Sequence, residues 1–225
     1  MGEFVTKGIY ETFPRTGTDT RRSTHYCPGC GHGIIEKLIA EAVHDLELED
    51  RAVYVDPVGC AVFGSYYLDG AHVSAAHGRA EAVATGISRV RPQAVTLVIQ
   101  GDGDLGAIGF NHSFQAANRG EHMAVFFVNN SLYGMTGGQM SPTTLPGQVT
   151  KTSPFGRDPL TTGYPLHVSE LFSTLQAPIY VARVSVADAG RIRTARAAIR
   201  KAVALQAQGA GYAFVEILSP EVSGC

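Results

Sequence analysis

The feature that most constrains the fold is a regular alternation between short apolar runs and helical segments. Residues 95–99 and 124–128 are apolar throughout, as expected for strands that are buried on both faces of a parallel sheet. Further strands are expected at residues 52–55, 179–186 and 212–218, and helices at residues 33–48, 78–91, 107–119, 166–175 and 189–208. The alternation predicts an α/β fold with a single parallel-sheet domain whose helices cover both faces.

Length and composition limit the classes of protein to consider. The chain has 225 residues, enough for one large domain, which we place at residues 27–225 after a polar N-terminal arm at residues 1–26. Charged residues make up 17%, which indicates either burial against partner subunits or a core rich in Gly and Ala. A net charge of −2 argues against nucleic-acid binding. Neither a membrane span nor a secretory leader is apparent, so we expect a cytoplasmic protein.

A glycine-rich loop follows the strand at residues 95–99. Its sequence, Gly-Asp-Gly-Asp-Leu-Gly at residues 101–106, matches the dinucleotide fingerprint, so a nicotinamide-binding site is the first interpretation to weigh. Asp102 argues against it, because a carboxylate inside the loop repels a diphosphate unless a cation lies between them. The ribose-binding acid expected about 20 residues later is also missing, since the next strand ends in Asn129 and Asn130.

Asp102 and Asn130 favour a metal site. Each follows a predicted strand, and the carboxyl ends of parallel strands share one edge of the sheet. Carboxylate, amide and phosphate oxygens are ligands that suit Mg²⁺. The alternative is that the two asparagines only form a turn. The long loop at residues 130–165, rich in Gly, Pro, Thr and Ser, fits a functional loop.

Three motifs together identify a family resemblance. They are the loop at residues 101–104 with the segment at residues 129–139, the segment His25-Tyr26-Cys27-Pro28-Gly29-Cys30-Gly31-His32, and the segment Pro57-Val58-Gly59-Cys60-Ala61. In combination they resemble the thiamine-diphosphate-binding β subunit of 2-oxoacid:ferredoxin oxidoreductases, closest to the 2-oxoisovalerate and 2-oxoglutarate types. The resemblance covers roughly residues 20–220.

The resemblance implies roles for individual residues. Asp102, Asn130 and the carbonyl of Leu132 would hold Mg²⁺. The remaining cofactor-binding residues would shape the diphosphate loop (Gly101, Gly103, Asp104), follow the metal turn (Tyr133, Met135, Thr136), or line the thiazolium side (Gly59, Cys60, His77, Gly78, Arg79). Cys60 and His77 are the expected catalytic residues of this chain. Met135 is also expected to shape the substrate pocket.

The cysteines have several interpretations. A Cys27-x-x-Cys30 pair fits zinc, a redox pair or an iron–sulfur cluster, and Cys60 with His32 would complete a zinc set. The resemblance implies a [4Fe–4S] cluster on Cys27, Cys30, Cys60 and a fourth cysteine near the C-terminus. The family has that cysteine directly after the segment that ends at Pro220, where this chain has Glu221. Cys225 is therefore the expected fourth ligand.

The implied reaction is oxidative decarboxylation of a 2-oxoacid, with release of CO₂ and transfer of the acyl group to coenzyme A. Electrons would pass through iron–sulfur clusters to ferredoxin, directly or through γ and ferredoxin-like δ subunits. The resemblance implies that the glutamate that activates the cofactor comes from a partner α subunit. Glu36 and Glu81, the upstream glutamates near motifs, are expected to be surface residues on helices. The chain alone is therefore expected not to turn over substrate.

Two other functions remain open from the sequence. One is a thiamine-dependent non-oxidative decarboxylase or synthase without a cluster, which would contain no iron. The other is a non-catalytic, zinc-stabilised binding subunit, which would contain zinc and no thiamine. His112, His122 and His167 are expected to be ordinary surface or core histidines.

Overall fold

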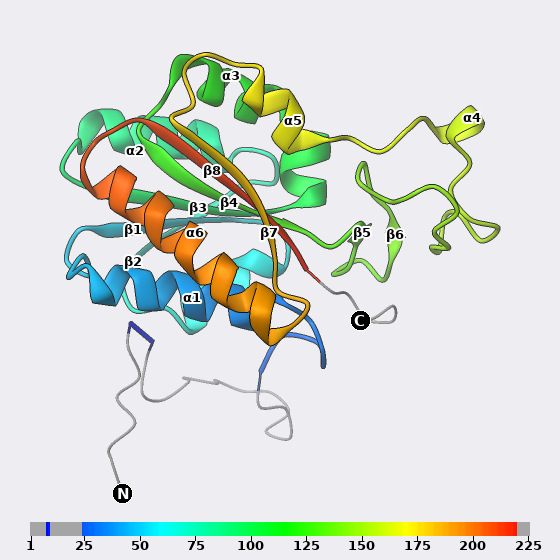
Figure 1. Ribbon diagram of the computed structural model, residues 1–225, viewed down its shortest axis with the longest axis horizontal. Coiled ribbons are helices and arrows are strands. Elements are labelled where there is room, and N and C mark those ends of the chain that lie inside the picture. The colour runs from blue at the N-terminus through cyan, green and yellow to red at the C-terminus, as the bar shows by residue number, and fades with distance from the viewer. Residues whose placement is uncertain (1–7, 10–23, 220–225) are drawn as a thin grey trace, which may run out of the picture.

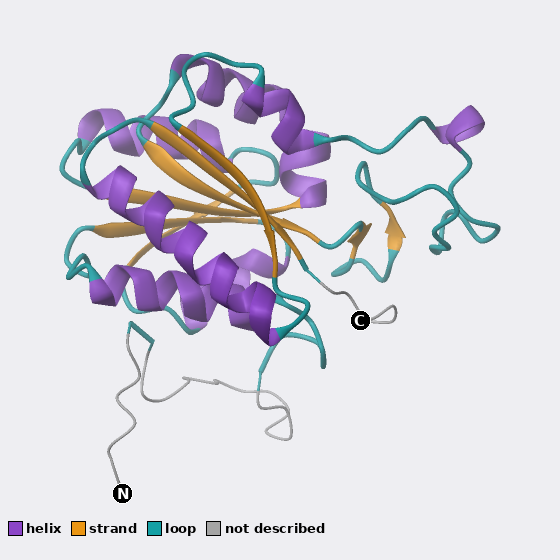
Figure 2. Ribbon diagram, viewed as in Figure 1, coloured by secondary structure: helices purple, strands orange, loops and turns teal. Residues whose placement is uncertain are grey.

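The computed structural model describes residues 8–9 and 24–219. Its centre is a six-stranded, wholly parallel sheet with strand order β2-β1-β3-β4-β8-β7 (Figures 1 and 2). The strands are β1 (Ala52–Pro57), β2 (Ala71–Ala75), β3 (Val95–Gly101), β4 (Met123–Asn129), β7 (Tyr180–Ser185) and β8 (Tyr212–Leu218). A small antiparallel pair, β5 (Leu132–Tyr133) and β6 (Gln139–Met140), lies beyond the end of β4.

Helices cover both faces of the sheet, as the sequence predicts (Figure 2). The helices are α1 (His32–Asp45), α2 (Ala80–Val90), α3 (Phe110–Arg119), α4 (Pro159–Thr162), α5 (Val168–Ser173) and α6 (Ala189–Ala207). A 3₁₀ helix, η1 (Cys60–Tyr66), follows β1, and a π-helical turn, η2 (Asp104–Ile108), follows β3.

The central strands are buried on both sides because their side chains alternate between two cores. Leu97 and Phe126 pack in one core with α1 and α6, whereas Val98 and Phe127 pack in the other with α2, α3 and α5. Figure 1 shows α1 and α6 crossing one face together and the other three helices on the opposite face. Uninterrupted apolar strands are what such a two-sided sheet requires.

The elements expected from the sequence are present, with differences at several places. The helix expected at residues 107–119 begins at Phe110, because residues 104–108 form the π-helical turn, a feature that often marks functional sites. Strand β2 and helix η1 were missed, as were the short elements β5, β6 and α4 within the segment expected to be a loop. β2 is an edge strand with a partly exposed, short sequence, so it carries little of the apolar signal of the central strands.

The described part of the N-terminal segment is small. Residues 8–9 contact the domain, since Ile9 pairs with Leu68 and the N–H of Asp69 donates to the carbonyl of Gly8. Residues 1–7 and 10–23 of the expected arm, and Cys225 with the rest of residues 220–225, lie outside the described residues. Within the described residues, no helix combines the length and apolarity needed to cross a membrane.

The two-sided core predicts a strong effect of truncation at Leu97, which is fully buried on β3. Leu97→Ala removes apolar contacts and leaves a cavity, so we expect the free energy of unfolding to fall by about 2–5 kcal/mol. Urea denaturation followed by circular dichroism measures it. The control is Val90→Ala, at a side chain that is 75% exposed, which should change the same quantity by less than about 0.5 kcal/mol. Equal effects at the two positions would contradict the assigned core.

Candidate functional site

A cavity of about 230 Å³ opens at the carboxyl ends of β1, β3 and β4. It is lined by residues from five segments: His32; Val58, Gly59, Cys60 and Ala61; His77; Gly101, Asp102, Gly103, Asp104 and Ile108; and Asn130, Leu132, Tyr133, Gly134, Met135 and Thr136. The sheet reverses its order here, because β1 is followed along the chain by β2 on one side and then by β3 on the other. Ligands of open α/β sheets bind at such switch points.

Asp102 is nearly buried at the cavity wall, with 3% of its surface exposed. Its Oδ2 accepts hydrogen bonds from the hydroxyls of Ser141 at 2.7 Å and Thr143 at 3.0 Å, and its Oδ1 accepts from the N–H of Gly103 at 2.8 Å. A buried carboxylate needs such partners to offset the loss of water. Ser141 and Thr143 are functional residues that sequence reasoning missed, since nothing in a Ser/Thr-rich loop shows which hydroxyls turn inward.

Asp104 connects the glycine-rich loop to the segment at residues 77–79. Its Oδ1 accepts from His77 Nδ1 and from the N–H of Gly78, both at 2.5 Å, and its Oδ2 accepts from Gln100 Nε2 at 2.5 Å. With Nδ1 held in this way, Nε2 is the ring nitrogen of His77 left for a ligand in the cavity. Asp104 therefore orients His77 in addition to shaping the loop.

Two glycines allow the close packing of this region. Gly78 has φ +73°, and a Cβ there would lie 2.5 Å from Ile108 Cγ2 and 2.8 Å from the backbone nitrogen of Gly109. At Gly103 a Cβ would lie 2.8 Å from the ring of Tyr133. Both positions exclude a side chain, so the backbone of the loop and the cavity wall approach each other directly.

Asn129 and Asn130 have different surroundings. The amide of Asn129 donates to buried Glu216 on β8 at 2.8 Å, and its Oδ1 accepts from the N–H of Ser131 at 3.2 Å. Asn130 instead lines the cavity. Ser131 adopts a left-handed conformation with φ 65°, which bends the chain so that Leu132 also reaches the cavity wall. The turn interpretation therefore describes Asn129, while Asn130 takes the position expected of a ligand.

The other expected site residues divide between cavity wall and surroundings. Gly59 has φ +131° and precedes η1, which begins at Cys60. Tyr133, Met135 and Thr136 line the opposite wall, and the hydroxyl of Thr136 donates to Gln139 Oε1 at 2.5 Å. Within the part of the chain that the structure describes, Gly78 and Arg79 do not line the cavity. Arg79 is exposed at the N-terminus of α2, where its Nη1 donates to the carbonyl of Gly78 at 3.0 Å.

The donor set at this end of the cavity suits Mg²⁺ bound to a diphosphate. A carboxylate from Asp102 and an amide from Asn130 come from the ends of two neighbouring strands, β3 and β4. Both are hard oxygen donors. Gly101 leaves space beside them, since a Cβ there would meet nothing within 4 Å. The residues present therefore fit the expected ion and its phosphate ligand.

The cysteine segment lies beside the same cavity. His32 lines it and is almost fully buried; burial lowers the pKa of His32 to about 4. Its Nδ1 is 3.1 Å from Cys30 Sγ, and its ring stacks on Tyr26 with 5.5 Å between centroids. Among residues 8–9 and 24–219, no three His, Cys, Asp or Glu side chains are grouped closely enough to hold a metal ion. Within the described residues, neither the ligands of the zinc interpretation nor Cys27, Cys30 and Cys60 of the cluster interpretation are gathered around one point.

Two glutamates expected at the surface are buried. Glu36 on α1 is 3% exposed and accepts a short hydrogen bond from the hydroxyl of Tyr26; burial holds the pKa of Glu36 well above its ordinary value. Glu81 on α2 is 1% exposed and accepts from the hydroxyl of Tyr212 at 2.9 Å. Burial raises the pKa of Glu81 to about 7, with a further contribution from nearby Asp104. The surface expectation was wrong because both residues lie on the helix faces that pack inward.

Comparison with known proteins identifies relatives. The family model described as the thiamine pyrophosphate enzyme, C-terminal TPP binding domain, matches residues 57–217. The ketoisovalerate oxidoreductase subunit VorA of Methanothermobacter thermautotrophicus is 59% identical over 212 residues, which are 94% of this chain and 44% of the relative. The 2-oxoglutarate synthase subunit KorB of Archaeoglobus fulgidus is 37% identical over 208 residues, which are 90% of this chain and 70% of the relative.

A solved structure is similar along nearly the whole chain. It is the 2-oxoglutarate:ferredoxin oxidoreductase from Magnetococcus marinus with 2-oxoglutarate, coenzyme A and succinyl-CoA bound. The TM-score is 0.77 at 28% identity, and the match covers 92% of this chain and 67% of that one. The present chain spans less than half the length of the ketoisovalerate relatives that it matches.

The close approach of Gly103 to the Tyr133 ring predicts that one carbon added at residue 103 weakens ligand binding in the cavity. Gly103→Ala forces the Tyr133 ring away, and such overpacking costs about 1–3 kcal/mol. We therefore expect calorimetric titration with thiamine diphosphate and Mg²⁺ to show affinity weaker by about tenfold or more. Gly86→Ala is the matched control, because Gly86 is exposed on α2 and an added Cβ there meets nothing within 4 Å. Unchanged affinity in Gly103→Ala would show that the ligand does not use this wall.

Burial of Glu81 predicts a particular pH dependence of stability. The pKa of Glu81 is raised from 4.5 to about 7, so over this interval the unfolded chain ionises while the folded chain retains the proton. The free energy of unfolding should fall by about 1.4 kcal/mol per pH unit as pH rises through the interval, and then level off. Glu81→Gln should lack this decline. Urea denaturation of both proteins at pH 5 and pH 7.5 tests it; parallel changes in the two proteins would refute the assignment.

Proposed function

We propose that this chain, which belongs to the thiamine pyrophosphate enzymes and among them to the 2-oxoacid oxidoreductase subunits, forms the diphosphate-binding half of a 2-oxoacid-oxidising active site. The observation that carries the proposal is the pairing of Asp102 and Asn130 in one cavity at the switch point of the sheet. A carboxylate inside a glycine-rich phosphate loop makes sense only with a cation between it and the phosphates.

The substrate class follows from the relatives. The ketoisovalerate relatives share 58–59% of the matched residues, against 37% or less for the 2-oxoglutarate relatives. We therefore propose a branched-chain 2-oxoacid as the first substrate to test and 2-oxoglutarate as the second. Coenzyme A is proposed as the acyl acceptor, because the similar solved structure was obtained with coenzyme A and succinyl-CoA. Met135, half exposed at the cavity wall, is in position to contact the side chain of the oxoacid.

The residues of this chain would bind and orient the cofactor. Asp102, Asn130 and the carbonyl of Leu132 would hold Mg²⁺, with Gly101 and Gly103 leaving room for the phosphates and Thr136 near them. The chemistry that bound thiamine diphosphate supplies is nucleophilic addition to a keto carbon, with storage of the electrons left when CO₂ departs.

On the other side of the cavity, Cys60 and His77 line the wall beside Gly59. They would face the reacting end of the cofactor, and the bond of His77 Nδ1 to Asp104 would hold Nε2 ready to give or take a proton.

The proposed electron path runs through the cysteines. Cys27, Cys30 and Cys60, with Cys225 as the fourth ligand, would hold a [4Fe–4S] cluster, since soft thiolates suit such clusters. Support comes from the residue types, from Cys30 lying 3.1 Å from His32, which lines the same cavity as Cys60, and from the ferredoxin named in the similar solved enzyme. Ferredoxin, or γ and ferredoxin-like δ subunits, would take the electrons, and an α subunit would provide the activating glutamate.

Anaerobic purification of the full chain together with its partner subunits tests the proposal. We expect bound thiamine diphosphate, four iron and four sulfide per cluster site, and viologen reduction that requires both a 2-oxoacid and coenzyme A. Asp102→Asn should lose the cofactor and the activity while keeping the iron. Cys60→Ser should lose iron and viologen reduction but still bind thiamine diphosphate.

A wild-type complex that contains thiamine diphosphate but decarboxylates without reducing viologen would refute the oxidative reaction. A complex that contains iron and no thiamine diphosphate would refute the assignment of the cavity.

A further inference from the structure

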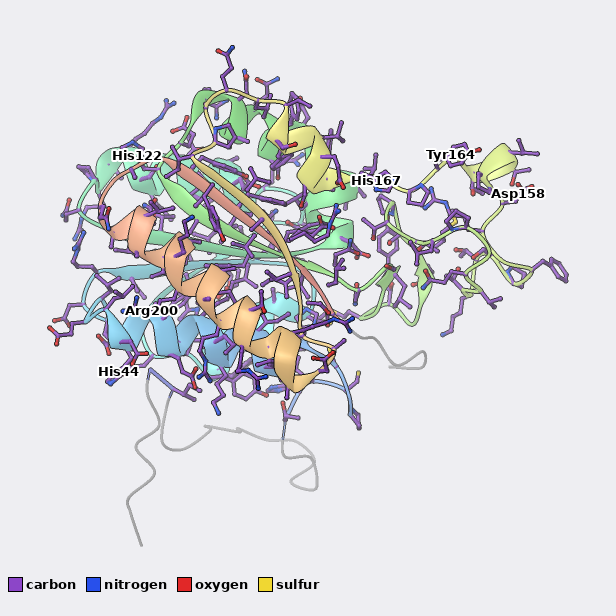
Figure 3. All side chains as sticks on the ribbon, viewed as in Figure 1. His44, His122, Asp158, Tyr164, His167 and Arg200 are labelled. Atoms are coloured by element: carbon purple, nitrogen blue, oxygen red, sulfur yellow. The ribbon has the colours of Figure 1, made fainter. Side chains whose placement is uncertain are left out.

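Exposed apolar side chains are concentrated on one segment that projects from the domain. This projecting loop (residues 145–164) leaves the body between β6 and α5 and carries α4 near its far end (Figure 1). Phe155 is fully exposed, Leu160 is 91% exposed and Tyr164 is 74% exposed. Figure 3 shows Asp158 and Tyr164 on this projection, well away from the sheet, with His167 where the chain returns to α5.

The projecting loop is held in shape by a buried arginine at its base. Arg157 is 5% exposed, and its Nη1 donates to the carbonyls of Thr144 at 2.7 Å and Pro142 at 3.1 Å. Its Nε and Nη2 donate to the carbonyls of Gly163 at 2.9 Å and Tyr164 at 3.0 Å. The guanidinium thus joins the segment that enters the loop to the segment that returns from it. A surface ordered in advance loses little conformational entropy when it binds.

Three large apolar side chains within ten residues are more than scattered surface residues. Each aromatic side chain can bury about 150–250 Å² against a partner, and clustered exposed apolar residues mark protein interfaces. Apart from buried Arg157, the charged residues of the loop are Lys151 and Asp158. A surface that fits it is therefore apolar at its centre and nearly uncharged, as the centres of protein interfaces are.

The base of the loop is also part of the cavity wall. Arg157 Nη1 contacts the carbonyl of Ser141 at 3.3 Å, and the hydroxyl of the same Ser141 donates to Asp102. The hydroxyl of Thr144 donates to the carbonyl of Ser131 at 2.6 Å, directly after Asn130. Displacement of the loop would therefore move the groups that hold both proposed metal ligands.

We propose that the projecting loop docks onto the protein region that the ketoisovalerate relatives carry outside the matched segment, and that docking fixes Ser141 and Thr144 against the metal site. In those relatives the matched segment is 44% of the chain, so more than half of each lies outside it. The inference rests on the proposed function, because Ser141 and Thr144 matter here as groups that hold the proposed metal ligands. Phe155, the most exposed of the three, is the proposed anchor, and Leu160 and Tyr164 add further apolar surface.

The experiment uses the full chain and the protein or region from the same genome that matches the rest of VorA. Phe155→Ser, and the triple variant with Leu160→Ser and Tyr164→Ser, should weaken the measured affinity between the two by about tenfold or more. Val90→Ser is the matched control, since Val90 is 75% exposed on α2, far from the loop in Figure 1, and should change the affinity by less than about twofold.

Unchanged affinity in the triple variant would overturn the docking proposal. So would self-association of the wild-type chain that Phe155→Ser abolishes without any effect on the partner, because the loop would then bind a second copy. Docking and function are measured separately. If the variants lose partner affinity as expected but the wild-type complex binds no thiamine diphosphate, the proposed function is refuted and the docking surface stands.

The coupling to the cavity has its own test in the assembled complex. Arg157→Lys keeps the charge but loses the planar set of donors, so thiamine diphosphate affinity should fall by about tenfold. Thr144→Val, which removes the hydroxyl that donates to the carbonyl of Ser131, should give a similar fall and is the variant to measure if Arg157→Lys does not keep its folded circular-dichroism spectrum. Wild-type thiamine diphosphate affinity in a folded Arg157→Lys complex, or in Thr144→Val, would overturn the coupling.

Discussion

Two buried carboxylates in one short loop, Asp102 and Asp104, determine how the rest of this site is built. Neither can be buried without hydrogen-bond donors, and the donors come from different parts of the chain. Ser141 and Thr143 approach Asp102 from the long loop after β4. His77 approaches Asp104 from the turn before α2. The need to satisfy these two carboxylates therefore brings two separate segments to the end of β3.

Much of the fold can be read from the sequence because the central strands carry an unambiguous signal. Residues 95–99 and 124–128 are apolar without interruption and lie at the centre of the sheet. Their order along the chain places Asp102 and Asn130 at adjacent strand ends, which is why their position in one cavity could be predicted. Edge strand β2 carries no comparable signal, since its residues are partly exposed.

One physical reason explains why the burial of Glu36 and Glu81 and the roles of Ser141 and Thr143 were not predicted. A helix pattern shows which face is apolar, but it does not show which polar groups the neighbouring elements offer to that face. Glu36 is buried because Tyr26, from the cysteine segment, donates to it, and Glu81 because Tyr212 of β8 does. Ser141 and Thr143 were missed for the same reason. Such pairs join residues far apart in the sequence, and a single sequence contains no record of them.

The cavity has a consequence for folding that follows from the strands that form it. Its walls come from the ends of β1, β3 and β4, so the ligand site exists only after these parallel strands, which are distant along the chain, have paired. Parallel pairing of this kind forms slowly, because long loops must close before contacts compensate for the lost entropy. A cofactor that binds only the finished cavity would shift the folding equilibrium by mass action, by about 2.7 kcal/mol at a concentration one hundred times its dissociation constant. Cofactor supply would then set how much of the chain is folded, as well as how much of it is active.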